Sequence, residues 1–159
     1  MISLGEVTTF VVAKMAEHLG PLDVLVGDGV APLDGGWGEG TPNTSGGFVP
    51  YVVIKANSAA SNQTDVPLCS TVPVRLSIQY VMTAHHISRA AADALAETAR
   101  RFLKALDGPP HHVQLGDISF RTNQVWIDSV SGAYRDDSTH PKFWSAATNF
   151  RAVVARGSA

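Results

Sequence analysis

The alternation of apolar and polar residues is clearest between Val72 and Thr83, where it predicts a long β-strand. Side chains on a strand point alternately to its two faces, so one face here is apolar and the other mostly polar. Val81 is the exception on the polar side. The apolar positions are Val72, Val74, Leu76, Ile78, Tyr80 and Met82. This pattern is typical of an antiparallel sheet that is covered on one face only.

After His85 and His86 the apolar residues recur at three- and four-residue steps, which predicts a helix that runs to Gly108. Ser88 is a candidate N-cap, because its hydroxyl can accept a hydrogen bond from the first turn. Gly108 permits a left-handed C-cap, and the two prolines after it prevent continuation. The apolar stripe consists of Ala92, Leu95, Ala99, Phe102, Leu103 and Leu106.

A second amphipathic pattern predicts a helix from Leu4 to Leu19. Ser3 and Glu6 match the spacing of a capping box, and Gly20 with Pro21 ends the pattern. The apolar face consists of Leu4, Val7, Phe10, Val11, Met15 and Leu19.

Shorter patterns predict further strands, separated by two polar loops. The strands are expected at Asp23–Gly27, Tyr51–Ala56, Val125–Ala133 and Phe143–Val154, with weak signals around Val113–Leu115. The loops are expected at Ala31–Gly47, which is rich in glycine and contains Trp37, and at Asn57–Thr71. In the last two strands we expect alternate faces. In the first of them, Val125, Ile127 and Ser129 are expected opposite Trp126, Asp128 and Val130. In the second, Phe143, Ala147, Asn149 and Arg151 are expected opposite Trp144, Ala146, Thr148, Phe150 and Ala152.

Strands grouped between two helices indicate an α+β fold. We expect one domain over residues 1–159, with an antiparallel or mixed β-sheet and both helices packed on one face. The tail from Ala155 to Ala159 is expected to fray.

Composition narrows the classes of partner. The net charge of −2 gives no general attraction to nucleic acid or to anionic membranes, and only 16% of the residues are charged. Lys55 and Arg75 could share the exposed sheet face, but no arginine–aromatic stripe accompanies them. The first twenty residues match neither a signal peptide nor a membrane span. Cys69 is the single cysteine, which excludes an internal disulfide and a cysteine-based zinc site.

Few residues point to chemistry. The pairs His85-His86 and His111-His112 are separated by a whole helix, so we expect surface histidines and no metal site. Asp136, Asp137, Ser138 and His140 contain the groups of a serine triad, but a run in one turn rarely gives triad geometry, and a structural turn is the better interpretation. We expect no catalytic residue, metal or cofactor.

The segment Tyr134–Ser138, followed by His140–Trp144 and Asn149–Arg151, resembles the C-terminal signature of bacteriophage tail terminator proteins, particularly those of phages that infect actinobacteria. The order of the upstream elements is also similar, including the strand at Pro50–Ile54. The loop Ala31–Gly47 is longer and richer in glycine than is usual in that family.

The resemblance implies a structural virion protein without enzymatic activity. Such a protein forms a closed, usually hexameric, ring that caps the tail tube, ends tail polymerisation and joins the tail to the head. The implied partners are further copies of the chain, the major tail tube protein and the head-completion or neck protein, with the tape measure protein as an additional candidate. The implied location is the head-proximal end of the virion tail, after assembly in the host cytoplasm. Contact residues are expected at Trp37, Arg75, Arg135, Asp136, Asp137 and Lys142.

Three alternatives remain open on sequence grounds. A head-completion or connector protein also forms rings. A small hydrolase would use Ser138 and His140, and a small-ligand binding protein would need an apolar pocket. For the ring hypothesis, we expect deletion of Gly35–Gly46 to leave the monomer folded and to impair ring formation or tail attachment.

Overall fold

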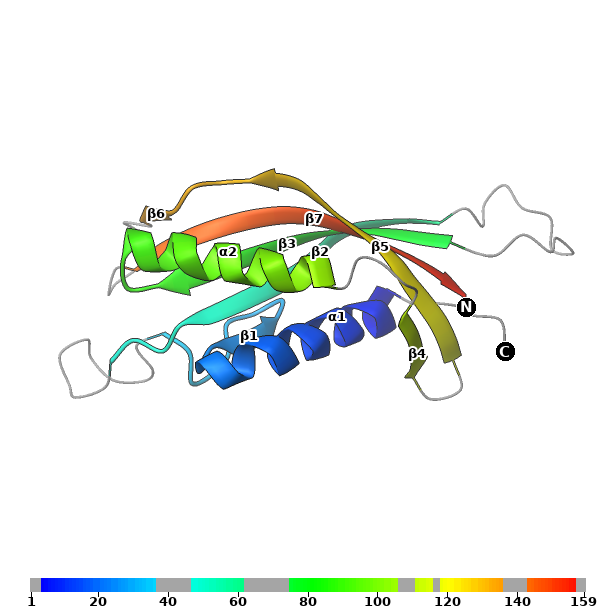
Figure 1. The fold of residues 1–159 in the computed structure, drawn as a ribbon, viewed down its shortest axis with the longest axis horizontal. Coiled ribbons are helices and arrows are strands. Elements are labelled where there is room, and N and C mark those ends of the chain that lie inside the picture. The colour runs from blue at the N-terminus through cyan, green and yellow to red at the C-terminus, as the bar shows by residue number, and fades with distance from the viewer. Residues whose placement is uncertain are drawn as a thin grey trace, which may run out of the picture.

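The computed structural model describes residues 4–36, 47–61, 75–105, 111–115, 118–135 and 143–156. A single twisted sheet has two α-helices against one of its faces (Figure 1), which confirms the α+β fold. The elements are α1 (Leu4–Leu19), a short 3-10 turn η1 (Gly20–Leu22), β1 (Leu25–Asp28), β2 (Tyr51–Ser61), β3 (Arg75–His86), α2 (Arg89–Ala105), β4 (His111–Leu115), β5 (Ile118–Val130), β6 (Tyr134–Arg135) and β7 (Trp144–Arg156).

The strand order is β1-β2-β3-β7-β5-β4, and β6 also pairs with β7. β1 is parallel to β2, whereas the other described pairs are antiparallel, so the sheet is mixed. The last strand, β7, lies in the middle between β3 and β5 and pairs with each along most of its length. The closing strand of the chain is therefore an integral part of the sheet.

Both helices cover the same face of the sheet. α1 lies along β1 and β2, and α2 lies across β3 and β7 (Figure 1). The buried side chains come from the two helix stripes and from alternate positions of the strands, as the sequence pattern predicts. At the centre, the rings of Tyr80 and Phe150 stack with centroids 5.0 Å apart. The largest fully buried side chains are Tyr80, Phe150, Met15, Leu19, Ile54, Ile78, Met82, Leu103, Val7 and Val52.

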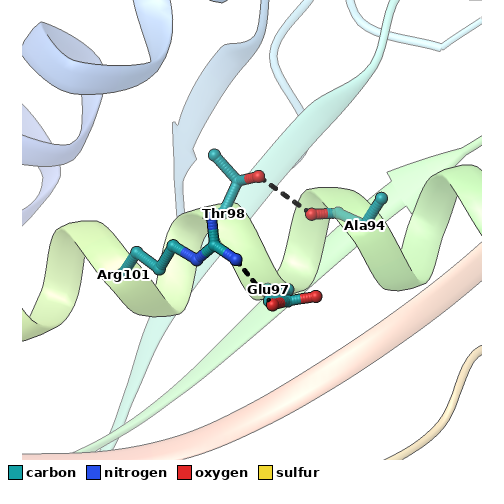
Figure 2. Close-up of polar contacts among 4 residues, drawn as sticks. All are labelled: Ala94, Glu97, Thr98 and Arg101. Atoms are coloured by element: carbon teal, nitrogen blue, oxygen red, sulfur yellow. Dashed lines mark hydrogen bonds and ion pairs between the residues drawn. The ribbon is translucent and has the colours of Figure 1, made fainter.

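The predicted helices are confirmed where they are described. α1 has the predicted bounds, and the amide of Ala91 donates to the Ser88 hydroxyl at 3.2 Å, so Ser88 caps α2. On the outer face of α2, Arg101 pairs with Glu97 at 2.9 Å, and the Thr98 hydroxyl donates to the Ala94 carbonyl at 3.0 Å (Figure 2). The capping residue Ser3 and the C-cap Gly108 lie outside the described residues.

The prediction that a loop begins at Asn57 is wrong. β2 continues to Ser61, and the polar stretch from Ser58 onward pairs with β3. A bulge between Ala56 and Ser58 shifts the register there. A bulge breaks the two-residue period, and the polar residues beyond it gave no sequence signal for a strand. The rest of the predicted loop, residues 62–71, lies outside the described part of the chain.

The C-terminal strands also differ from the prediction. The strand predicted at Val125–Ala133 ends at Val130, and β4 and β5 form a longer hairpin before it than the weak signals indicated. A bulge between Ile127 and Ser129 places Ser129 opposite Asn149 and Val130 opposite Thr148. The face predicted for Ser129 and Val130 is therefore wrong. β7 pairs as far as Arg156, so the prediction of fraying is wrong for Ala155 and Arg156, and residues 157–159 lie outside the described part of the chain.

Candidate assembly surface

The second face of the sheet carries no helix among the described residues. We call it the open face and define it by outward positions of β2, β3, β7 and β5. In register across these strands, Lys55, Val81, Asn149 and Ser129 form one row. The other members are Val53, Thr83, Ala147, Ser58, Gln79, Arg151 and Trp126. Val81, the exception in the alternating strand, belongs to this face.

The polar side chains of the open face largely satisfy one another. The Ser58 hydroxyl donates to the Gln79 side-chain oxygen at 3.3 Å, and the Asn149 amide donates to the Ser129 hydroxyl at 2.8 Å. Val81 lies next to Asn149 in the same row, and Val53, Thr83 and Ala147 form the next row; all four are half-buried and neutral. Covering these paired side chains and their neutral neighbours costs less than covering unpaired polar groups.

A hollow of about 410 Å³ lies over the same part of the open face. Its floor includes Val53, Val81 and Thr83. Val30 contributes from the segment after β1, and Tyr134 contributes from β6. Both are exposed, at 71% and 51% respectively. The hollow is therefore wide and shallow, as expected for contact with a protein surface.

One end of the open face is closed by a cluster of aromatic rings, which we call the aromatic cluster. It consists of Phe48, Tyr51, His85, His86 and Phe143. Tyr51 stacks on His85 with centroids 4.5 Å apart, and Phe143 meets the same imidazole edge-on at 5.4 Å. The prediction of surface histidines near the helix ends is wrong for His85, which lies inside β3 and is largely buried in this cluster.

The imidazole of His85 also bonds to β7. Its Nδ1 lies 2.7 Å from the Ser145 hydroxyl, and Ser145 itself is only 3% exposed. Burial lowers the pKa of His85 from 6.5 to about 4, because the charged form would lose its hydration. Burial also lowers the pKa of His86 and raises the pKa of Tyr51. His85 is therefore neutral at physiological pH.

Ser145 and His85 are close enough to be a nucleophile and its base, but their surroundings suit a structural bond better. A histidine with a pKa of about 4 is a weak base near neutral pH. Among the described residues no carboxylate bonds to its ring, whereas a catalytic triad orients the imidazole in that way. The bond therefore ties β3 to β7 beneath the aromatic cluster.

The base of the glycine-rich loop is fixed on this cluster. Gly36 and Val49 form a two-way backbone bridge, with N···O distances of 2.8 and 2.7 Å. A Cβ atom added at Gly35 would approach the Tyr51 ring to 3.0 Å, so glycine permits this close approach. Phe48 packs beside the bridge. Both ends of the loop are thus held against the end of the sheet.

A charged group lies at the other end of the open face. The guanidinium of Arg151 lies 5.1 Å from the centroid of the Trp126 ring and 3.4 Å from Asp128. Its Nε is buried without a hydrogen-bond partner among the described residues. A polar hollow of about 380 Å³ adjoins it, lined also by Asn57 and Gln79. The sequence pattern placed Arg151 on the same face as Ala147 and Asn149, as the structure does, but Arg151 was not among the predicted contact residues.

The residues predicted as contact sites are not brought together by the described structure. Arg75 begins β3 and Arg135 ends β6, where it is exposed. The other predicted contact residues, Trp37, Asp136, Asp137 and Lys142, lie outside the described residues, as do Ser138 and His140 of the hydrolase hypothesis.

Neither a metal-ligand cluster nor a membrane-spanning helix occurs in the described ranges. They contain no group of three or more histidine, cysteine, aspartate or glutamate residues that could hold a metal ion. In the same ranges, neither α1 nor α2 has the length and apolar character needed to cross a bilayer. A comparison with protein-family models and with curated proteins finds no match for this chain.

Proposed function

We propose that this chain is a structural subunit of a long-tailed bacteriophage, which forms a ring on the end of the tail tube and makes or breaks no covalent bond. In this proposal the ring ends polymerisation of the tube and joins the tail to the head. The sequence resemblance over Tyr134–Arg151 suggests this role, and the open face is the structural observation that carries it.

The open face supports an assembly role because four long strands leave it without a covering layer in the described structure. β2, β3, β5 and β7 have 11, 12, 13 and 13 residues. Its apolar residues Val53 and Val81 are half-buried, Ser58 is paired with Gln79, and Asn149 is paired with Ser129. A surface of this kind is suited to cover by another protein, because few unpaired polar groups must lose water.

The aromatic cluster supports the same role through rigidity. Tyr51, His85 and Phe143 come from different segments and fix the end of the sheet beside the loop base at Gly36 and Val49. A preorganised surface loses little conformational entropy when it binds. In the proposal, the open face contacts the tube protein, and the flanks of the sheet contact neighbouring copies.

The alternative is a head-completion or connector protein, which would also use ring contacts but would bind the portal side of the neck. The two roles differ in the partner that the ring recognises. Purified chain can be mixed with polymerising tail tube protein of the same phage, and tube lengths can be measured by electron microscopy. We expect shorter tubes with a ring at one end. Unchanged tube lengths with bare ends would reject the tube-capping role.

A hydrolase would be identified by the same preparation. Turnover of ester or peptide substrates that disappears in the Ser138→Ala variant would contradict the structural role. A structural turn at Ser138 predicts no turnover in either protein and at most a modest loss of stability in the variant.

A further inference from the structure

The segment after β1 presents an exposed apolar and acidic turn. The amide of Gly35 donates to the Pro32 carbonyl at 3.0 Å, which closes a β-turn with Leu33 and Asp34 at its centre. Leu33 is 95% exposed, the highest value among the exposed large apolar side chains of the described residues, and Asp34 is exposed beside it. We call residues 32–35 the Leu33 turn.

The Leu33 turn is held in place by the strands next to it. The amide of Gly29 donates to the Ile54 carbonyl at 2.9 Å, and Gly36 is bridged to Val49. At Gly27, an added Cβ would lie 2.0 Å from the Val30 carbonyl oxygen, so only glycine lets the chain fold back this closely. The backbone of the Leu33 turn is therefore held by the adjacent strands and has little conformational freedom left to lose on binding.

The opposite flank of the sheet carries a groove between α2 and β5, which we call the α2–β5 groove. Its volume is about 540 Å³. The apolar lining comes from Val125, Ile127 and Val130 of β5, and Val130 is 52% exposed. Arg100 and Lys104 of α2 form its cationic side. The full lining is Arg100, Lys104, Val125, Trp126, Ile127 and Val130.

The cations of this groove differ from their neighbour Arg101. Arg101 is neutralised by Glu97 on the outer face of α2 (Figure 2). Arg100 donates to the neutral Thr148 hydroxyl at 3.2 Å, and Lys104 has no carboxylate partner within the described ranges. The groove thus combines an apolar floor with positive charge that the described acidic residues leave uncompensated.

We infer that the Leu33 turn of one copy binds in the α2–β5 groove of the next copy. Leu33 would enter the apolar floor, and Asp34 would approach Lys104. Charge supports this pairing: residues 15–54 contain five acidic residues and no lysine or arginine. The inference rests on the proposed function, which requires self-assembly, and it names the two surfaces that meet.

The positions of the two surfaces favour a chain of contacts. In the strand order, β1 and β5 are separated by β2, β3 and β7, so the turn and the groove occupy opposite flanks of one molecule (Figure 1). One patch against a different patch is a heterologous contact, which closes into a ring when the rotation is correct. Repeated between neighbours, such a contact would link successive copies in the same orientation, as a ring requires.

Charge exchange tests the contact. Lys104→Glu and Asp34→Lys should each weaken self-association by ~10-fold or more, and the double variant should recover most of it. Arg101→Glu is the control, because it makes the same change of charge at a residue of the same helix that is outside the groove lining, and it should have little effect on self-association. Equal loss in Arg101→Glu and Lys104→Glu, or no recovery in the double variant, would overturn the inference.

Cross-linking tests proximity independently. In a Cys69→Ser background, Leu33→Cys with Val130→Cys should give disulfide-linked dimers and higher species under mild oxidation. These positions are on opposite flanks, so such a disulfide joins two copies. The control pair is Leu33→Cys with Ala16→Cys, which lies on the exposed side of α1. Cross-linking no greater than in the control would overturn the inference.

The two levels of the proposal fail in different ways. A ring that caps tubes but gives no Leu33–Val130 cross-link would reject this contact and leave the proposed function standing. Cross-linked rings that leave tube lengths unchanged would support the contact and reject the capping role.

Discussion

The hydroxyls of Thr8 and Tyr80 lie 3.1 Å apart inside the core, where they join α1 to the middle of β3. Tyr80 is almost fully buried, and burial raises the pKa of its phenol to about 12. Thr8 is buried as well, at 7% exposure. A polar bond in this position fixes the register of α1 on the sheet, because a displaced helix would leave the phenol without its partner.

Thr8→Val should lower the free energy of unfolding by about 1–3 kcal/mol, the usual cost of a buried hydroxyl that loses its partner. Urea denaturation measures the change. Thr9→Val is the matched control, because Thr9 is exposed and bonds only within α1, to the Gly5 carbonyl. Its effect should be below ~0.5 kcal/mol. Equal losses in both variants would show that the bond to Tyr80 contributes nothing.

Acid should destabilise the protein through His85. Its pKa is about 4 in the folded chain and near 6.5 when unfolded, so the unfolded state binds the proton more tightly. The contribution of the neutral His85 imidazole to the free energy of unfolding is fully present above pH 6.5 and is lost as the pH falls toward 4. The loss is at most about 3 kcal/mol, at about 1.4 kcal/mol for each pH unit between the two pKa values.

His85→Phe should remove this pH dependence while keeping an aromatic ring against Tyr51 and Phe143. The measurement is the free energy of unfolding at several values between pH 4 and pH 7 for both proteins. We expect the difference between wild type and variant to change by up to the same amount over this range. Parallel curves would contradict a buried neutral imidazole.

The structure defines a shorter deletion of the glycine-rich loop, which keeps the backbone bridge between Gly36 and Val49. Deletion of Gly35–Gly46 would also remove the turn and bridge contacts of Gly35 and Gly36. Deletion of residues 37–46 would instead leave Gly47 and Phe48 as a two-residue connection between the bridged Gly36 and Val49, a length that tight hairpins use.

We expect the shorter deletion to unfold at nearly the wild-type urea concentration and to lose ring formation or tail attachment. Circular dichroism and urea titration measure the first property, and tube capping measures the second. Normal rings and normal capping in this variant would show that the loop plays no part in assembly.

The open face can be altered without disturbing the core. Val81→Glu places a carboxylate opposite Lys55 on β2, and cross-strand pairs of opposite charge are favourable, so the fold should tolerate it. Binding to the tube should fall because a carboxylate, which must lose water on contact, replaces a half-buried apolar side chain of the face. Ala13→Glu, on the exposed side of α1, is the control. Equal tube binding by both variants would show that the open face does not contact the tube.

Much of the architecture follows from periodicity. The alternation at Ile78, Tyr80 and Met82 and the described parts of both helix stripes correctly identified the buried face, because a strand or helix that buries one face carries apolar residues at the spacing of that face. The bulges at Asn57 and Asp128 were not predicted. A bulge inserts one residue without a composition signal of its own, so every face assignment beyond it is reversed.

The candidate surfaces were harder to predict because they depend on pairing between distant segments. His85 becomes buried only when Tyr51 from β2 and Ser145 from β7 lie beside it. The aromatic residues at the ends of several predicted strands could have indicated the aromatic cluster. The sequence does not give the register of strand pairing, however, so it does not show that these residues meet. The α2–β5 groove likewise depends on how the helix lies against the sheet, which local sequence does not specify.

Cryo-electron microscopy of tail tubes assembled with and without this chain tests the central claim most directly. The account predicts tubes of limited length, each ending in a closed ring whose subunits fit the seven-stranded sheet and its two helices. Tubes of the same length in both samples, with no such ring at their ends, would contradict it.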